Sequence, residues 1–184
     1  MVKGKHKGLL GLFQAVNLTP HPITVLREDG TQIELPSLGG LRLKEETETV
    51  PWSESLAVPV VDKRFTELEV QVKGAEELET LQRILTDPTR HVALIVSLPV
   101  IQVLSSLDNQ KLAEVLREAL GKAIGREVLA GLLPLAPDTG PASAVRDRDG
   151  RIIGVRRFVR SVKYAMAPVS TSSPVRRRKV DFSP

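Results

Sequence analysis

The most conspicuous chemical groups in this sequence are the arginines gathered in its last third. Residues 145–184 contain 11 Lys and Arg against 3 Asp, whereas residues 8–144 contain 12 Lys and Arg against 19 Asp and Glu. Lys and Arg side chains neutralise phosphates and release counterions, so this segment is a candidate nucleic-acid-binding surface. The candidate nucleic-acid or partner-binding residues are Arg146, Arg148, Arg156, Arg157, Arg160, Arg176, Arg177, Arg178 and Lys179.

Few aromatic side chains accompany these arginines. Phe158, Tyr164 and Phe182 are the aromatic residues of the segment, and base stacking needs more of them. Any binding to nucleic acid is therefore expected to use phosphates without reading the base sequence. The same charges also suit a protein contact, in which the basic tail pairs with the acidic body of a neighbouring copy. A solvated tail without a partner is the third interpretation.

The segment Pro137-Asp138-Thr139-Gly140-Pro141 contains an Asp-Thr-Gly triplet. In aspartic proteases such a triplet supplies a catalytic carboxylate, which needs a second Asp from another repeat or another copy. Here prolines flank the triplet on both sides, and the sequence holds no second one. The pattern therefore favours a structural turn, in which Asp138 accepts backbone N–H groups and Gly140 adopts a positive φ.

His21 lies between two prolines in Thr19-Pro20-His21-Pro22. A zinc site needs three or four ligands, but His6 and His91 have no ligand-like spacing and the chain has no cysteine. We therefore expect no metal site and no disulfide. Thr19 or His21 is expected to hydrogen-bond to local backbone and so fix the turn into the first strand.

No catalytic constellation stands out in the sequence. It has no glycine-rich phosphate-binding loop, no dinucleotide-binding glycine pattern and no Gly-x-Ser-x-Gly nucleophile motif. We predict no enzymatic activity and no cofactor. The alternative is an enzyme or small-ligand protein, which would require His21, Asp138 and Arg146 to converge in one pocket.

Two Asp-Gly turns predict β-hairpins, because Asp-Gly between alternating apolar runs is a strong hairpin signal. Asp29-Gly30 joins strands expected at 23–26 and 31–35, and Asp149-Gly150 joins strands expected at 143–148 and 151–159. Further strands are expected at 41–43, 57–61 and 68–72. The continuous apolar run 91–96 is typical of a central strand covered on both faces.

Apolar periodicity predicts helices at 75–86 and 108–124. Asp108 is the expected N-cap of the second helix, and Gly125 is expected just after its end. Ser97 is expected to cap a short helix that ends near Leu104. The prolines of the segment 134–141 predict a loop.

These elements predict an α+β protein with a mixed, mostly antiparallel sheet, two or three helices packed on it, and basic flexible ends. We expect a basic arm at 1–8, a single domain at 9–166, and a Ser/Pro/Arg-rich tail at 167–184. No run of 18 apolar residues predicts a membrane span, and no signal peptide is recognisable, so secretion is not expected. The chain has 2 Met and no Cys, a composition that favours a thermophilic source.

Two segments carry a family resemblance. Val-Asn-Leu-Thr-Pro-His-Pro-Ile-Thr-Val at 16–25, and Pro-Asp-Thr-Gly-Pro-x-Ser-x-Val-Arg-Asp-x-x-Gly-x-Ile-x-Gly-Val-Arg at 137–156, together resemble small uncharacterised proteins encoded by tailed phages. Ile95-Val96-Ser97 matches a short segment between them. The helices at 75–86 and 108–124, the basic arm and the tail depart from that pattern. The resemblance implies viral origin and implies no chemistry.

The expected function is that of a viral structural or nucleic-acid-associated protein, and specifically a virion component. Its expected partners are further copies of itself, other virion proteins or nucleic acid of any sequence. Its expected location is the virion, the host cytoplasm or both. The alternative is a viral regulator that binds a host protein through an exposed sheet edge.

Overall fold

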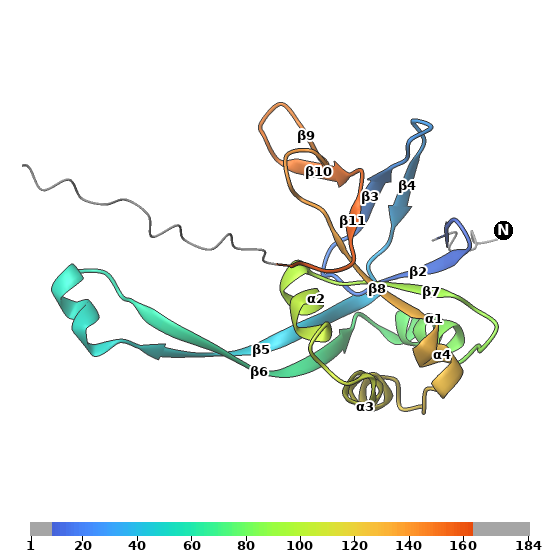
Figure 1. Ribbon diagram of the computed structural model, residues 1–184, viewed down its shortest axis with the longest axis horizontal. Helices are drawn as coiled ribbons and strands as arrows, with labels where there is room; N and C mark the ends of the chain where they lie inside the picture. The colour runs from blue at the N-terminus through green and yellow to red at the C-terminus, as the bar shows by residue number, and fades with distance from the viewer. Residues whose placement is uncertain (1–8, 164–184) are drawn as a thin grey trace, which may run out of the picture.

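The computed structural model describes residues 9–163, which form an α+β fold with mostly antiparallel strand pairing, as the sequence predicts (Figure 1). The strands are β1 (Leu9–Leu10), β2 (Phe13–Asn17), β3 (Ile23–Leu26), β4 (Gln32–Leu35), β5 (Gly39–Thr49), β6 (Val61–Val72), β7 (Val92–Ile95), β8 (Leu132–Pro137), β9 (Ala144–Arg146), β10 (Ile152–Val155) and β11 (Phe158–Val159). The helices are η1 (Pro51–Leu56), α1 (Ala75–Leu85), α2 (Leu98–Leu104), α3 (Asn109–Leu120) and α4 (Arg126–Ala130). The basic arm predicted at 1–8 and the tail predicted at 167–184 lie outside the described residues.

The central sheet has the order β1-β2-β7-β8-β11, with β7 in the middle. Strands β2 and β8 both run parallel to β7, and every residue of β7 is buried. Parallel strands need cover on both faces, which explains the continuous apolar run in the sequence. Because side chains alternate along a strand, Val92 and Leu94 belong to one core, while Ala93 and Ile95 belong to another.

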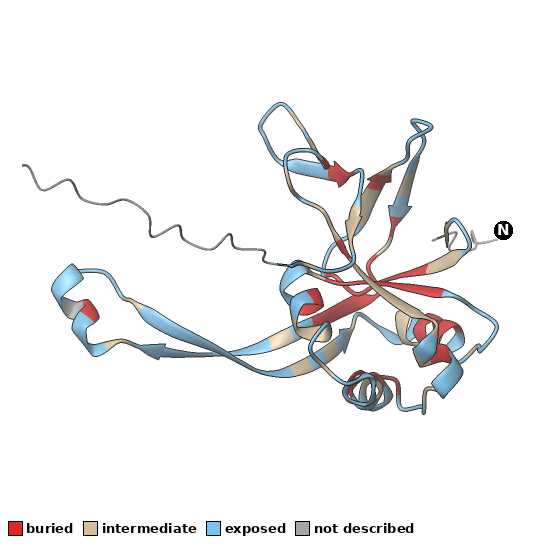
Figure 2. Cartoon of the chain, viewed as in Figure 1, coloured by how far each residue is buried: buried red, intermediate tan, exposed pale blue. Residues whose placement is uncertain are grey.

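The α-helices lie together on one side of the central sheet, whereas η1 lies at the end of the β5/β6 hairpin (Figures 1 and 2). Helix α3 buries Leu112, Val115 and Leu116 in the main core, and it contacts β6 and α1. The Asp108 carboxylate accepts a hydrogen bond of 2.9 Å from the backbone N–H of Gln110, so the predicted N-cap is confirmed. Helices α1 and α2 also form where the sequence predicts them.

The predicted end of the third helix was wrong. Helix α3 ends at Leu120, and Gly121 follows with a left-handed φ of 64°. Such a conformation stops a helix and favours glycine. Gly125, which was expected to end this helix, instead precedes the short helix α4 as its N-cap.

The loop predicted from the prolines of 134–141 was also wrong, because its first part is strand β8. Pro134 pairs with Leu94 in the middle of the sheet. The Leu135 carbonyl oxygen accepts from the Val96 N–H, so the backbone polar groups of Pro134 face away from β7. Strand β11 lies on that side but pairs only with Ala136 and Pro137. The missing N–H of Pro134 therefore costs no ladder hydrogen bond.

A second sheet, β4-β3-β10-β9, contains both predicted Asp-Gly hairpins. Gly30 and Gly150 adopt positive φ values of 82° and 80° at the two turns. Strands β3 and β10 pair in parallel through Val25 and Val155. This sheet packs on the other face of the central sheet through a smaller core around Val25, Leu35 and Ile95. No helix among the described residues is long and apolar enough to cross a membrane.

Candidate interaction surface

The largest departure from a closed globule is the long hairpin formed by β5 and β6. At its root, Leu41 pairs with Val70 and Leu43 pairs with Leu68, and these side chains pack on the main core. Beyond the root, residues 44–67, here called the projecting hairpin, extend away from the body (Figure 1). At about 3.3 Å per residue, the strand from Lys44 to the turn alone spans roughly 20 Å.

Polar side chains form ion pairs along the shaft of the projecting hairpin, that is, residues 44–50 and 59–67. Lys63 Nζ lies 2.7 Å from Glu45 Oε1, and Lys44 Nζ lies 3.7 Å from Glu67 Oε2. The hydrogen bond from Lys63 lowers the pKa of Glu45 below its usual value. Exposed ion pairs of this kind contribute only about 0–1 kcal/mol each. Beyond the root, β5 and β6 pair only with each other, and such a two-stranded ribbon alone is marginally stable in water.

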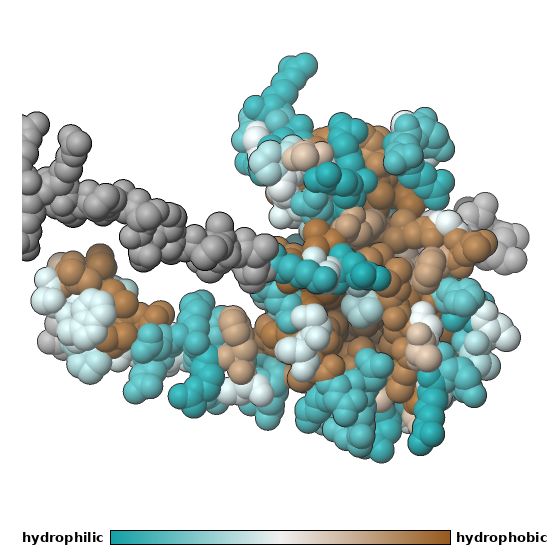
Figure 3. All heavy atoms as spheres, viewed as in Figure 1, coloured by the Kyte–Doolittle hydropathy of each residue, from teal (hydrophilic) through white to brown (hydrophobic). Residues whose placement is uncertain are grey.

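The tip of the projecting hairpin, residues 51–58, carries three exposed apolar side chains. Trp52 is 61% exposed, Leu56 52% and Val58 59%. Figure 3 shows hydrophobic side chains gathered at the end of a hydrophilic shaft. Ala57 holds a left-handed φ of 57°, a conformation that costs an alanine about 1 kcal/mol. Exposed apolar side chains gathered at the end of a polar hairpin make this tip a candidate interaction site.

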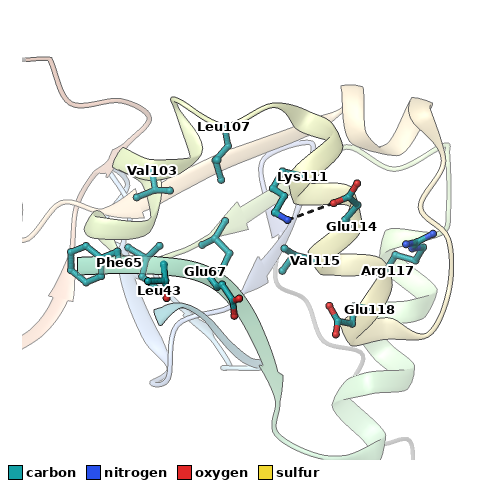
Figure 4. Close-up of a pocket in the computed structure, with 12 residues that line it drawn as sticks. Leu43, Phe65, Glu67, Val103, Leu107, Lys111, Glu114, Val115, Arg117 and Glu118 are labelled. Carbon is teal, nitrogen blue, oxygen red and sulfur yellow. Dashed lines mark ion pairs between the residues drawn. The ribbon is translucent and has the colours of Figure 1, made fainter. Parts of the chain in front are cut away.

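A cavity of about 880 Å³ lies between the hairpin root and the helices. Leu43, Phe65 and Val103 line its apolar side (Figure 4). Its rim mixes charges, with Glu67, Glu114 and Glu118 beside Lys111 and Arg117. Lys111 Nζ lies 3.7 Å from Glu114 Oε2, as the dashed line in Figure 4 marks.

A groove of about 550 Å³ opens over the smaller core, between the central sheet and the end of β3. Ala93, Leu133 and Leu135 of β7 and β8 line it, with Phe13 and Phe158 from neighbouring strands. The second sheet therefore leaves part of this face uncovered. The rim includes Arg27, Glu28, Asp29 and Arg156.

The Asp-Thr-Gly segment is a structural turn between β8 and β9, as the sequence predicts. Asp138 Oδ1 accepts a hydrogen bond of 2.9 Å from the Gly140 N–H. Asp138 Oδ2 accepts from Arg157 Nη2 at 2.9 Å and from Nε at 3.2 Å. The Ser143 hydroxyl oxygen accepts from the backbone N–H groups of Arg156 and Arg157. The segment thus ties β8 to the strands β9, β10 and β11.

The expected positive φ of Gly140 was wrong, because Gly140 is not among the described residues with positive φ. A Cβ at this position would lie 3.0 Å from Asp138 Oδ1. Glycine at this position therefore eases the close approach of the Asp138 side chain and does not serve an unusual backbone angle. Thr139, between the two, is exposed.

The Thr-Pro-His-Pro segment is held by a buried asparagine. Asn17 Nδ2 donates to the carbonyl oxygens of His21 at 3.0 Å and Leu35 at 2.9 Å. Asn17 Oδ1 accepts from the Thr19 N–H at 2.9 Å. The Thr19 hydroxyl lies 2.7 Å from Asn17 Oδ1 and 3.0 Å from the His21 carbonyl oxygen. Both predicted residues therefore act in the turn, His21 through its backbone, and the asparagine that organises them was missed.

The arginines of the C-terminal strands fall into two groups. Arg157 pairs with Asp138, and Arg146 Nη1 donates to the Gly150 carbonyl oxygen at 2.7 Å. The second group is exposed, and within residues 9–163 its side chains make neither a hydrogen bond nor an ion pair. It includes Arg148, Arg151, Arg156 and Arg160. Arg176, Arg177, Arg178 and Lys179 lie outside the described residues.

The structure engages Asp138 and Arg146 in separate contacts, and neither they nor His21 line the 880 Å³ cavity or the 550 Å³ groove. Among residues 9–163 no group of three or more His, Cys, Asp or Glu side chains could hold a metal ion.

No family model, curated protein or solved structure matches the chain. The projecting hairpin is therefore the most developed candidate site.

Proposed function

We propose that this chain is a viral structural protein that assembles through its projecting hairpin, and specifically that it is a virion component. The observation that carries the proposal is the exposed apolar tip, with Trp52, Leu56 and Val58 held at the end of a polar shaft. Covering these side chains would release roughly 25 cal/mol for each Å² of apolar surface removed from water. The resemblance of residues 16–25 and 137–156 to phage-encoded proteins supports the viral part of the proposal.

Sedimentation velocity of the full chain over a range of concentrations tests the assembly. The natural chain is expected to self-associate, and the combined variant Leu56→Ser and Val58→Ser is expected to stay monomeric. Leu98→Ser is the control, because Leu98 is an exposed apolar residue of the body, 39% exposed, and should not alter association. A monomeric natural chain at all concentrations, or equal loss in the control, would overturn the proposal. Comparing the proteins of purified virions with those of infected cells tests the virion assignment.

A second candidate function is binding of nucleic acid of any sequence. It is favoured by residues 144–163, which contain seven Lys and Arg against two Asp. Binding should fall with salt, with a slope of log K against log salt near −0.9 for each phosphate neutralised on duplex DNA. Removing residues 174–184 deletes four basic side chains and should reduce that slope by up to about four such units. Full-length protein that fails to bind at low salt would exclude this function.

A further inference from the structure

The groove over the smaller core leaves part of one face of the central sheet open to solvent. We propose that it receives the hairpin tip of a second copy of this chain, so that Trp52, Leu56 and Val58 of one molecule cover the partly exposed Leu133, Leu135 and Phe158 of the next. This inference rests on the proposed assembly function and names its partner and its contact.

The occupant must come from another molecule. The groove lies between the central sheet and β3, whereas the projecting hairpin leaves the opposite end of the fold (Figure 1). The hairpin is a continuous ladder from Gly39↔Val72 to Thr49↔Val61 with one irregularity at Lys44/Glu45. Such a ladder cannot fold back on its own body without losing its strand pairing.

Charge favours the groove through the basic strands beside it rather than through its own rim. The projecting hairpin, residues 44–67, contains six Asp and Glu against three Lys and Arg. Residues 144–163, whose Arg156 and Phe158 line the groove, contain seven Lys and Arg against two Asp. The 880 Å³ cavity has three glutamates against Lys111 and Arg117 on its rim, and the groove rim pairs Arg27 and Arg156 with Glu28 and Asp29. The acidic hairpin is attracted to the basic surface formed by residues 144–163, and opposite potentials favour that encounter.

The groove is large enough to receive apolar side chains of the tip, but it is not by itself a whole interface. The groove of about 550 Å³ falls in the range of roughly 300–1,000 Å³ that is typical of ligand pockets. A stable protein interface uses roughly 20–30 residues on each side, and the projecting hairpin supplies roughly 24. The tip alone would be too small, so the shaft must lie on the basic strands as well.

Trp52 is the single tryptophan of the chain, so the tryptophan fluorescence reports the environment of the tip alone. In the natural full-length protein, rising concentration should shift the tryptophan emission to the blue and reduce its quenching by acrylamide. An emission that stays unshifted while the protein associates would show that the tip remains in water, which would overturn the docking. If the protein does not associate at all, the proposed function fails first.

The absence of cysteine from the sequence allows the receptor to be located by disulfide cross-linking. Three full-length single-cysteine variants are needed: L56C at the tip, E28C on the groove rim, and E118C on the rim of the other cavity as matched control. Equimolar L56C and E28C should give a linked dimer under mild oxidation, several-fold more than either variant alone. The mixture of L56C and E118C should give no more than the single variants.

Three outcomes would overturn the groove as the docking site while leaving hairpin assembly intact. Linkage of L56C to E118C would place the tip in the other cavity. Linkage of L56C alone, at the yield of the mixture, would show that two tips pair with each other. A concentration-dependent emission shift combined with no linkage to E28C would likewise reject the groove as the receptor.

Discussion

Replacing Asn17 by Ala should destabilise the protein more than any other polar substitution in the Thr-Pro-His-Pro turn. Asn17 is 1% exposed and donates to the carbonyl oxygens of His21 and Leu35 while accepting from the Thr19 N–H. The Thr19 hydroxyl keeps the His21 carbonyl oxygen as an acceptor, so three hydrogen bonds are lost. At about 1 kcal/mol each, the expected loss is about 3 kcal/mol.

The assay is urea and thermal unfolding of the full chain with three variants. A loss of 3 kcal/mol corresponds to a fall in Tm of roughly 6–12 °C for a chain of this length. Thr19→Val removes only the hydroxyl and should cost about 1 kcal/mol, while Thr19→Ser keeps it and should cost less. If Asn17→Ala costs less than Thr19→Val, the asparagine does not organise this turn and the reasoning is refuted.

Three further substitutions test the core, the pH dependence and the hairpin root. Leu116 is 1% exposed, so Leu116→Asp buries a charge and should cost at least about 4 kcal/mol; an unchanged thermal transition would show that this face of α3 is not buried. The hydrogen bonds from Thr89, with the neighbouring Arg90, lower the pKa of Asp87 below its ordinary value of 3.8. A lowered folded-state pKa stabilises the fold above the unfolded value and loses that contribution as pH falls through the folded value. Asp87→Asn should therefore lower Tm at neutral pH, and the difference from the natural chain should shrink in acid; a difference that stays constant into strong acid would contradict this. Gly39→Ala places a Cβ 2.2 Å from the Gln71 carbonyl oxygen, so its loss in urea unfolding should exceed that of Gly30→Ala, whose Cβ meets nothing within 4 Å; equal losses would show that the root accommodates the methyl group.

Strands and helices that bury one or both faces could be predicted from the sequence, and strands exposed on both faces could not. The central strand, the hairpins at Asp29-Gly30 and Asp149-Gly150, and helix α1 each carry a burial period or a turn signal. The shaft of the projecting hairpin is exposed on both faces from Lys44 to Thr49, so it has no apolar alternation to detect. The remaining signal was weak and lay in the opposite charges of the facing pairs Lys44↔Glu67 and Glu46↔Arg64, which become meaningful only once the register is known.

The same limit applied to the polar sites. The turn role of Asp138 follows from its neighbours in sequence, because Gly140 lies two residues away. Its partner Arg157 lies nineteen residues away, beyond any local pattern. The sequence therefore predicted many interchangeable arginines, whereas the structure commits Arg157 to a structural ion pair and leaves Arg148 and Arg156 exposed.

Charge separated along the chain is also separated in space, and this has a consequence for assembly. The acidic projecting hairpin and the basic strands β9, β10 and β11 lie at different ends of the described fold (Figure 1). A contact between unlike patches is heterologous, so each molecule that donates a tip still offers an empty groove to another. Association by this contact continues until a ring closes or a filament grows, and it does not stop at a symmetric dimer. Raising the salt concentration should shorten such assemblies, because the Debye length falls from about 8 Å at physiological ionic strength to about 3 Å at 1 M.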